Sequence, residues 1–155
     1  LVDCVLLALP YACGDIESEI LFEDRLFLAY PGNEQPPEIA TADTIDEKRL
    51  LLLEDGHCLK DHVLSACNRP ELRANATMLG TSLHTLVQMV DNGLGVTMLP
   101  EMAIEAEILA NTSITTRALV ADHASRSIAF AWRRASPRGK EFELLAKVLR
   151  EVTHA

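Results

Sequence analysis

Two cysteines, Cys58 and Cys67, stand nine positions apart in the most chemically suggestive stretch of this sequence. A cysteine thiolate can attack a peroxide or a disulfide, and a second thiol can then complete a reversible disulfide bond. If the residues between them form a helix, nine positions turn through about 900° and rise by roughly 13.5 Å. A disulfide requires Cα atoms only about 4.4 to 6.8 Å apart. The pair can therefore form a static bridge only where no helix exists, or a switch in which oxidation melts the helix.

A reactive Cys58 would need help, because a free cysteine with a pKa of about 8.5 is mostly protonated at neutral pH. The order of strand, turn and helix places Cys58 at or near a helix N-terminus, whose unpaired N–H groups favour a thiolate. His57, if protonated, and Lys60 would add positive charge. Three nearby carboxylates act against it, those of Glu54, Asp55 and Asp61. Asp61 could instead cap the helix, pair with a cation or relay a proton, and the sequence leaves these roles open.

Simpler explanations of these cysteines are also open. Free cysteine packs as a small apolar residue, and Cys4 and Cys13 are also nine positions apart, so the spacing alone carries little weight. Zinc could be shared by Cys58 and His62, but the sequence has no CxxC or HxxxH pair to complete the ligands. The glycines at residues 93–95 follow an expected helix and precede an expected strand, the reverse of the order that cradles a nucleotide phosphate. We therefore expect neither a metal nor a cofactor.

The composition indicates one folded domain and disfavours a nucleic-acid-binding surface. The chain has 155 residues, 48% of them hydrophobic, and a formal net charge of -9. That charge, without a Lys/Arg cluster, argues against direct contact with DNA phosphates. Four cysteines are too few for a small secreted disulfide scaffold, and neither a signal peptide nor a membrane-spanning run is visible. We expect a cytoplasmic protein, and the abrupt start at an apolar strand suggests a fragment of a longer one.

Apolar runs and turn residues predict alternating strands and helices. Strands are expected at residues 4–9, 16–30, 50–53, 75–79, 96–99, 114–120 and 128–132. The first should be buried on both faces, and the second should break into two near Glu23 and Asp24. Helices are expected at residues 41–48, in the segment that follows Cys58, and from Ser136 onward. Another should follow a cap formed by Thr81 and Ser82. A further helix should cover residues 101–108, with Pro100 in its first position. This alternation predicts an α/β domain with a mostly parallel sheet.

Several stretches give the sequence a family resemblance. They read LLLLEDGHCLKD at residues 50–61, TSLHTLVQMV at residues 81–90 and GLGVTMLP at residues 93–100. With VDCVLLALP at residues 2–10 and RSI at residues 126–128, they extend over nearly the whole chain. The chain resembles the OxyR family of peroxide-sensing LysR-type transcription regulators. The Gly-x-Gly and Leu-Pro features are general to LysR-type effector domains, whereas GHCL with a second cysteine nine residues later is specific to the OxyR family.

The resemblance implies chemical roles for six residues. Cys58 would be the peroxide-reactive cysteine, and Cys67 would be its resolving partner in the disulfide. The pocket that polarises the peroxide would be formed by His57, Lys60, Asp61 and Arg126. Position 60 is usually arginine in this family, so Lys60 keeps the charge but loses a planar, two-nitrogen contact. Val63 and Leu64 beside the cysteine could change exposure during the switch, or simply pack as part of an amphipathic helix.

The resemblance also implies the fold, an α/β domain with two periplasmic-binding-protein-like lobes. Residues 1–26 and 127–155 would form the first regulatory subdomain, incomplete at its N-terminus, and residues 27–126 the second, which carries the redox switch. The DNA-binding helix-turn-helix of this family, and an earlier segment that carries pocket threonines, are absent from this sequence. We therefore expect an isolated chain to sense poorly and not to bind operator DNA.

The function implied is a redox-sensing regulatory domain, not an enzyme. Its partners would be hydrogen peroxide, further copies in a dimer or tetramer, DNA through the missing N-terminal domain, and a thiol reductant such as glutaredoxin or thioredoxin. Two alternatives use the same residues differently. A LysR-type effector domain would bind a small molecule between its lobes, with incidental cysteines. A thiol peroxidase would share the first chemical step but would consume peroxide continuously.

Overall fold

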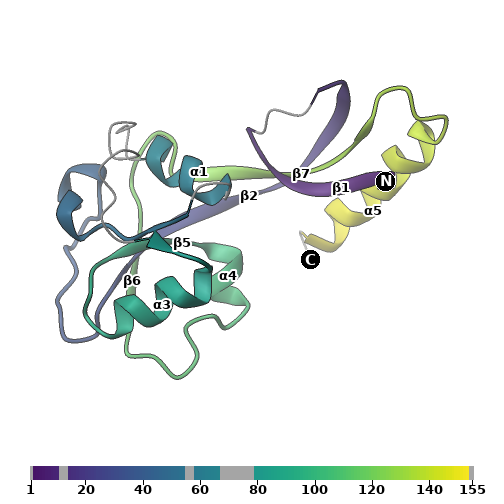
Figure 1. Cartoon of the computed structure of the whole chain (residues 1–155). Helices are drawn as coiled ribbons and strands as arrows, with labels where there is room; N and C mark the ends of the chain where they lie inside the picture. Colours follow the sequence, from purple (N-terminus) through teal and green to yellow (C-terminus); the bar gives the residue numbers. More distant parts are fainter. Residues whose placement is uncertain (1, 11–13, 55–57, 67–78, 154–155) are drawn as a thin grey trace. The chain divides into compact units, whose positions relative to one another are not determined.

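The chain folds into two compact units (Figure 1). The computed structural model describes residues 2–10, 14–54, 58–66 and 79–153. Leu1–Asp24 and Arg126–Ala155 together form the first unit, and Arg25–Ser125 forms the second. The chain therefore passes from one unit to the other twice. Within the described residues, no helix is long and apolar enough to cross a membrane.

The first unit is a small sheet on which one helix packs. Strand β1 (Cys4–Leu9) pairs antiparallel with strand β7 (Ser125–Arg133), and strand β2 (Ile16–Tyr30) is the other neighbour of β7. Helix α5 (Gly139–Thr153) contributes to the core of this unit. That core consists of five buried residues: Leu21, Phe130, Trp132, Phe142 and Ala146. The three aromatic rings have centroids 5.7 to 6.3 Å apart, a separation at which tilted and edge-to-face rings attract one another.

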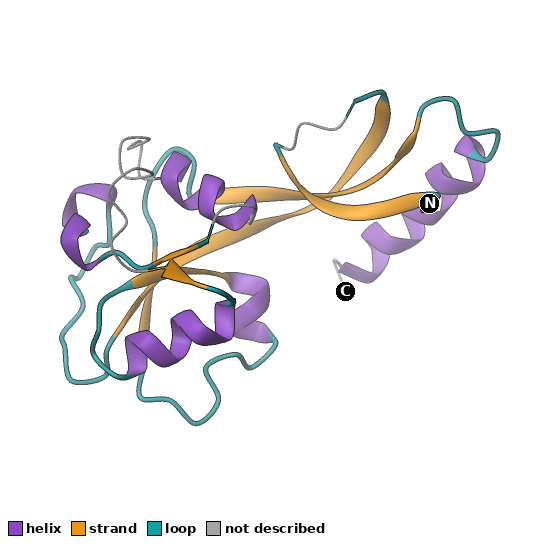
Figure 2. Ribbon diagram, viewed as in Figure 1, coloured by secondary structure: helices purple, strands orange, loops and turns teal. Residues whose placement is uncertain are grey.

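The second unit combines short strands with helices (Figure 2). The later part of β2 pairs antiparallel with β5 (Thr97–Pro100) and with β6 (Thr115–Ala118). Strand β3 (Leu52–Leu53) runs parallel to β4 (Leu79–Gly80). The helical segments are the 3-10 turns η1 (Ala42–Thr44) and η2 (Glu47–Arg49) and the helices α1 (Cys58–Ala66), α3 (Leu83–Asp91) and α4 (Glu101–Glu105).

Helix α3 shows how local sequence sets one element. The hydroxyl of Ser82, its N-cap, accepts a hydrogen bond from the backbone N–H of Thr85 at 3.2 Å. Gly93 follows the helix with a φ of 77°, the left-handed conformation in which many helices end. The buried face consists of Leu86, Val87 and Val90. The cap, the apolar face and the stop that the sequence predicts are confirmed.

A run of four leucines lies at the centre of the second unit. Residues 50–53 are each no more than 5% exposed. Leu50 forms a parallel bridge with Val96, and the leucines of β3 pair in parallel with β4. The backbones approach closely here, because a Cβ atom at Gly95 would clash with the carbonyl oxygen of Arg49. The predicted buried parallel strand is confirmed.

Strand β2 is continuous from Ile16 to Tyr30, so the predicted break near Glu23 and Asp24 is wrong. Asp24 is buried, and its carboxylate forms an ion pair with Arg126. A buried charge is tolerated within a strand when it has a partner of opposite charge. The acidic residues therefore do not interrupt the strand.

The prediction of a mostly parallel sheet is also wrong. The pairings of β1 with β7, of β2 with β5 and of β2 with β6 are antiparallel, whereas β3 and β4 are parallel. The alternation of strands and helices indicates a parallel sheet only when each helix connects neighbouring strands. Here β2 takes partners far along the chain, so the pairing direction is mixed.

Several expected details of single elements also differ. Val5 and Leu6 of β1 are 45% and 56% exposed, and successive residues of a strand point to opposite faces of the sheet, so the predicted burial of β1 on both faces is wrong. The helix expected at residues 41–48 consists instead of the two 3-10 turns η1 and η2.

The starts of two helices also differ from the prediction. Pro100 is the N-cap of α4 and not its first residue, and α5 begins at Gly139 and not at Ser136. Most of the strand expected at residues 75–79 lies outside the described residues.

Candidate functional site

Helix α1 carries three of the residues with predicted chemical roles. Cys58 is its first residue, and Lys60 and Asp61 follow in the first turn. The N–H groups of a first helical turn lack intrahelical partners and carry partial positive charge, which stabilises a nearby anion such as a thiolate. Cys58 is half-buried and is not part of a disulfide. The prediction that Cys58 lies at a helix N-terminus is confirmed.

Most of α1 is embedded in the second unit. Six of its nine residues are buried: Leu59, Lys60, His62, Val63, Leu64 and Ala66. Four of these six belong to the main hydrophobic core, together with the leucine run that includes β3. Asp61 and Ser65 are exposed. A helix of nine residues is marginal on its own, so packing and not intrinsic propensity stabilises α1.

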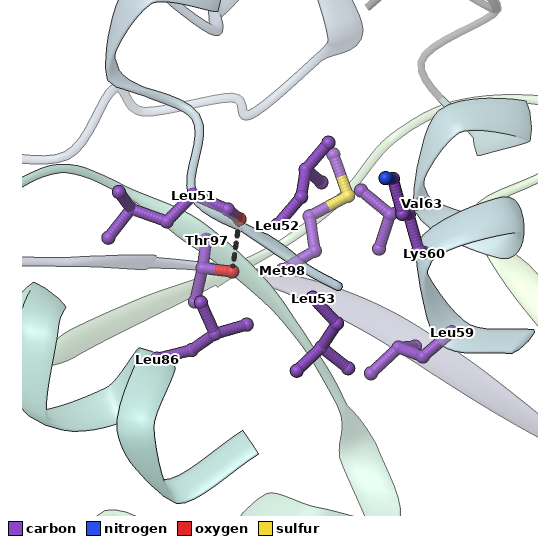
Figure 3. Close-up of a pocket in the computed structure, with 9 residues that line it drawn as sticks. All are labelled: Leu51, Leu52, Leu53, Leu59, Lys60, Val63, Leu86, Thr97 and Met98. Carbon is purple, nitrogen blue, oxygen red and sulfur yellow. Dashed lines mark hydrogen bonds between the residues drawn. The ribbon is translucent and has the colours of Figure 1, made fainter. Parts of the chain in front are cut away.

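A narrow cavity lies beneath α1 (Figure 3). Its lining comes from α1, α3, β5 and the leucine run: Leu51, Leu52, Leu53, Leu59, Lys60, Val63, Leu86, Thr97 and Met98. Thr97 donates a hydrogen bond from Oγ1 to the carbonyl oxygen of Leu51 at 2.9 Å, and Lys60, only 4% exposed, borders the cavity. The cavity volume is about 10 Å³, near the smallest space that holds one water molecule. It is therefore too small for an organic effector.

A wider pocket lies at the C-terminal end of α1. Its lining comes from η1, the last turn of α1 and the segment after β6: Thr41, Ala42, Asp43, Ser65, Ala66, Val120, Ala121, Asp122 and His123. Hydroxyl, carboxylate and imidazole groups share this wall with apolar side chains. The volume is about 450 Å³, within the range of small-molecule sites. Of these two pockets, only this one has room for a small organic ligand.

Arg126 belongs to the first unit, where its guanidinium contacts a buried carboxylate. Its Nε and Nη2 atoms each lie 2.9 Å from Oδ2 of Asp24. Asp24 is 2% exposed, and the side chain of Arg126 is 10% exposed. Asp24 was not among the residues to which the sequence pattern assigned a chemical role. The available signal was the two-residue period that puts Asp24 on the same buried face of β2 as Leu26 and Leu28.

Two predicted site residues, His57 and Cys67, lie outside the described residues, as does Cys13. The structure places Cys58, Lys60 and Asp61 together on α1. Arg126 belongs to the other unit. Within the part of the chain that the structure describes, no three His, Cys, Asp or Glu side chains are grouped so as to hold a metal ion.

The sequence matches the LysR substrate binding domain family over residues 1–154. It is 34% identical over 153 residues to the HTH-type transcriptional regulator EstR of Acinetobacter baylyi. It is 36% identical over 158 residues to a "Probable hydrogen peroxide-inducible genes activator" of Streptomyces viridosporus. The alignments cover 98% and 97% of this chain but 51% and 49% of the two relatives. The chain therefore spans about half the length of the curated relatives it matches.

A solved structure of similar fold is the reduced form of the regulatory domain of OxyR2 from Vibrio vulnificus, with a TM-score of 0.86. The two sequences are 35% identical, and the match covers 97% of this chain and 71% of that one. The predicted fold class, an α/β LysR-type effector domain, is confirmed by this similarity. Domains of this family are regulatory parts of transcription regulators, so the prediction that the chain is not an enzyme is confirmed. The chain belongs to the LysR substrate-binding domain family.

Proposed function

We propose that this chain is the redox-sensing regulatory domain of a hydrogen-peroxide-responsive transcription regulator. The observation that carries the proposal is the position of Cys58 as the first residue of a packed helix. The GHCL run around it supports the same function, as do the names of two relatives, an OxyR2 regulatory domain and a hydrogen peroxide-inducible activator. In this proposal peroxide oxidises Cys58, which then forms a reversible disulfide with Cys67.

The oxidation proceeds in two balanced steps. The Cys58 thiolate attacks one oxygen of hydrogen peroxide, so that an S–O bond forms, the O–O bond breaks and the departing hydroxide takes up a proton to become water. The sulfur loses two electrons to the peroxide and becomes a sulfenic acid. The Cys67 thiolate then attacks that sulfur, an S–S bond replaces the S–O bond, and the second oxygen also leaves as water. A cellular thiol reverses the change by thiol–disulfide exchange.

The disulfide is coupled to structure because Cys58 begins a nine-residue helix. A helix of that length places the Cα atoms of residues 58 and 66 about 12 Å apart along its axis. Because consecutive Cα atoms are about 3.8 Å apart, the cysteine that follows cannot come within the roughly 4.4 to 6.8 Å that a disulfide needs while α1 is intact. Closing the bond therefore requires α1 to unwind, which removes its apolar side chains from the core of the second unit. Oxidation would in this way remodel the domain and its oligomer.

Further roles follow from the family resemblance. His57, Lys60, Asp61 and Arg126 would polarise the bound peroxide. Residues 1–26 with 127–155, and residues 27–126, would act as the two regulatory subdomains. In the longer regulator, dimers or tetramers would bind DNA through an N-terminal helix-turn-helix, and glutaredoxin or thioredoxin would reset the oxidised state in the cytoplasm.

The test treats the chain with hydrogen peroxide and follows each cysteine by differential alkylation and mass spectrometry. We expect a disulfide between Cys58 and Cys67, together with faster hydrogen exchange in α1, because an unwound helix loses its protected N–H groups. Cys58→Ser should abolish both changes. Cys4→Ser removes a half-buried cysteine of the first unit, so this matched control should leave both changes intact. Disulfide formation with unchanged exchange in α1 would contradict the switch.

A small-molecule receptor is the second candidate function. EstR, whose name does not mention peroxide, is about as similar to this chain as the peroxide-related relative. The wider pocket beside α1 also has room for a small ligand. A receptor would keep its response in the Cys58→Ser variant, whereas a peroxide sensor would lose it. Sustained peroxide consumption, beyond one equivalent for each chain, would instead indicate a thiol peroxidase.

A further inference from the structure

The wider pocket at the C-terminal end of α1 is built from three separate segments of the second unit. All of its lining residues lie between residues 41 and 123, inside the range Arg25–Ser125. The first segment is η1 with the residue before it, the second is the last turn of α1, and the third follows β6. The pocket is therefore formed within a single unit.

Hydrogen bonds hold two of these three walls in place. The N–H of Val120 donates to the carbonyl oxygen of Ala40 at 2.8 Å, and Ala40 also forms a parallel bridge with Leu119. Oγ1 of Thr44 donates to the carbonyl oxygen of Thr41 at 2.8 Å and accepts a hydrogen bond from the N–H of Thr41 at 3.1 Å. None of these bonds involves α1. The two walls are thus formed before a ligand arrives, as in most small-molecule sites.

Helix α1 supplies the third wall. Ser65 is exposed at the pocket, and Ala66 is 4% exposed. Unwinding of α1 would displace both residues and remove this wall. A ligand that fits the pocket would therefore bind the helical form in preference to the unwound form. Such a ligand shifts the equilibrium toward the form that it binds.

The lining indicates the charge of the ligand. Asp43 and Asp122 carry carboxylates, Thr41 and Ser65 carry hydroxyls, and no lining residue is lysine or arginine. These oxygens accept hydrogen bonds from an ammonium group, and the formal net charge of -9 repels anions. Alanine and valine side chains in the same lining would contact hydrocarbon. A metal ion fits poorly, because the described residues include no group of three His, Cys, Asp or Glu side chains that could hold one.

We propose that this pocket binds a small organic cation, with ammonium groups on a short hydrocarbon chain, and that the bound cation holds α1 in its helical form. The effect on oxidation rests on the proposed function, in which Cys58 and Cys67 join only after α1 unwinds. The bound cation would slow closure of the disulfide. It would leave the first oxidation of Cys58 unchanged, because Cys58 lies at the opposite end of the helix.

Three ligands with the same five-carbon chain test the chemical class: 1,5-diaminopentane, pentane-1,5-diol and glutarate. Each is titrated into the 155-residue chain, and binding is followed by the NMR shifts of backbone amides. We expect the diamine to cause saturable shifts in the three walls, the diol to bind more weakly and glutarate not to bind. Equal binding of the three ligands would overturn the inference. Diamine shifts that are scattered over the surface and do not saturate would also overturn it.

A pair of matched variants separates the pocket from net charge. Ser65→Arg places a cation in the wall and should weaken diamine binding about tenfold or more, because like charges repel. Ser18→Arg adds the same charge at an exposed position of the first unit and should leave the affinity nearly unchanged. Asp122→Asn should weaken binding about twofold to fivefold. Equal losses in the two arginine variants would show that the diamine senses only net charge and would overturn the inference.

The coupling to α1 is measured by hydrogen exchange. At a diamine concentration ten times its Kd, the unwound population falls about elevenfold, so amides of α1 that exchange through unwinding should slow by the same factor. Exchange in α1 that is not slowed by bound diamine would overturn the inference.

Peroxide treatment then separates this inference from the proposed function. With the diamine bound, disulfide closure should slow about elevenfold, whereas dimedone trapping of the sulfenic acid in Cys67→Ser should keep its rate. If the diamine binds and protects α1 but peroxide never joins Cys58 to Cys67, the proposed function fails and the site remains. If the disulfide closes at the same rate with and without bound diamine, the inference fails and the proposed function remains.

Discussion

The two units of this protein hold their helices in different ways. In the second unit, α1 has nine residues and buries six of them. In the first unit, α5 has fifteen residues and buries only Phe142 and Ala146. Helix α1 packs into a large leucine-rich core, whereas α5 itself supplies two of the five buried residues of a smaller core. The length of a helix therefore says little about how firmly it is held, and the helix that carries Cys58 is the more deeply embedded one.

The buried side chains of α1 set the free energy that unwinding this helix would cost. Burying an aliphatic side chain contributes about 1.5 to 3 kcal/mol, so Leu59, Val63 and Leu64 together contribute roughly 5 to 9 kcal/mol. Losing this packing would oppose the proposed disulfide. For a two-electron couple, about 1.4 kcal/mol corresponds to roughly 30 mV. The bond should therefore be easier to reduce than an unstrained structural disulfide, which suits a switch that must be reset.

Replacing Phe142 should break the first unit most severely. Phe142→Ala should lower the free energy of unfolding by about 3 to 5 kcal/mol, because α5 has few other buried contacts. Trp132 is the single tryptophan of the chain, and its ring centroid lies 6.0 Å from that of Phe142. Denaturant unfolding followed by tryptophan fluorescence therefore reports on this unit. An unchanged fluorescence midpoint would show that the aromatic core does not hold α5.

One leucine on each helix allows the same change to be made in both units. Leu64 in α1 is 3% exposed and Leu144 in α5 is 63% exposed. We expect Leu64→Ala to cost about 2 to 5 kcal/mol and Leu144→Ala to stay within about 0.5 kcal/mol, both measured by circular dichroism in denaturant. Similar losses for the two variants would contradict the contrast between the helices. If Leu64→Ala also moves the fluorescence midpoint of Trp132, the two units unfold together.

The smallest effect on stability should come from the exposed ion pair of Arg25 and Glu101. The pKa of Glu101 is lowered, mainly by its hydrogen bond with Arg25. A carboxylate with a lowered pKa stabilises the fold above its unfolded value of about 4.3, and this contribution is lost as the pH falls through the lowered pKa. The unmodified chain should thus be slightly more stable than Glu101→Gln at neutral pH, and thermal unfolding should show the difference vanishing in acid. A difference that is independent of pH would rule out this origin.

Local patterns were enough to predict several elements. The cap and stop of α3, the buried leucines at residues 50–53 and the start of α1 each depend on residues close together in the sequence. The errors concern contacts between distant segments. Asp24 reads as a strand break because its partner, Arg126, is 102 positions away, and pairing directions depend in the same way on distant partners.

The candidate site could be predicted only in part, for the same reason. The place of Cys58 at a helix N-terminus follows from the strand and turn before it, and the structure confirms it. The role of Arg126 comes from the family resemblance alone, since nothing near it in the sequence indicates chemistry. Asp24 was overlooked because its charge suggested an exposed position. The two-residue burial period that it shares with Leu26 and Leu28 instead places it on the buried face of β2.

Gly93 and Gly95 stand two positions apart and exclude side chains for unrelated reasons. Gly93 has a φ of 77° with no neighbour in the way, whereas a Cβ at Gly95 would clash with the carbonyl oxygen of Arg49. The first requirement is one of handedness, which a residue of opposite chirality satisfies as well as glycine does. The second is one of crowding, which the torsion angle at Gly95 does not relieve. A D-alanine introduced by chemical ligation at position 93 would therefore distinguish a chiral constraint from a steric one within a single tight turn.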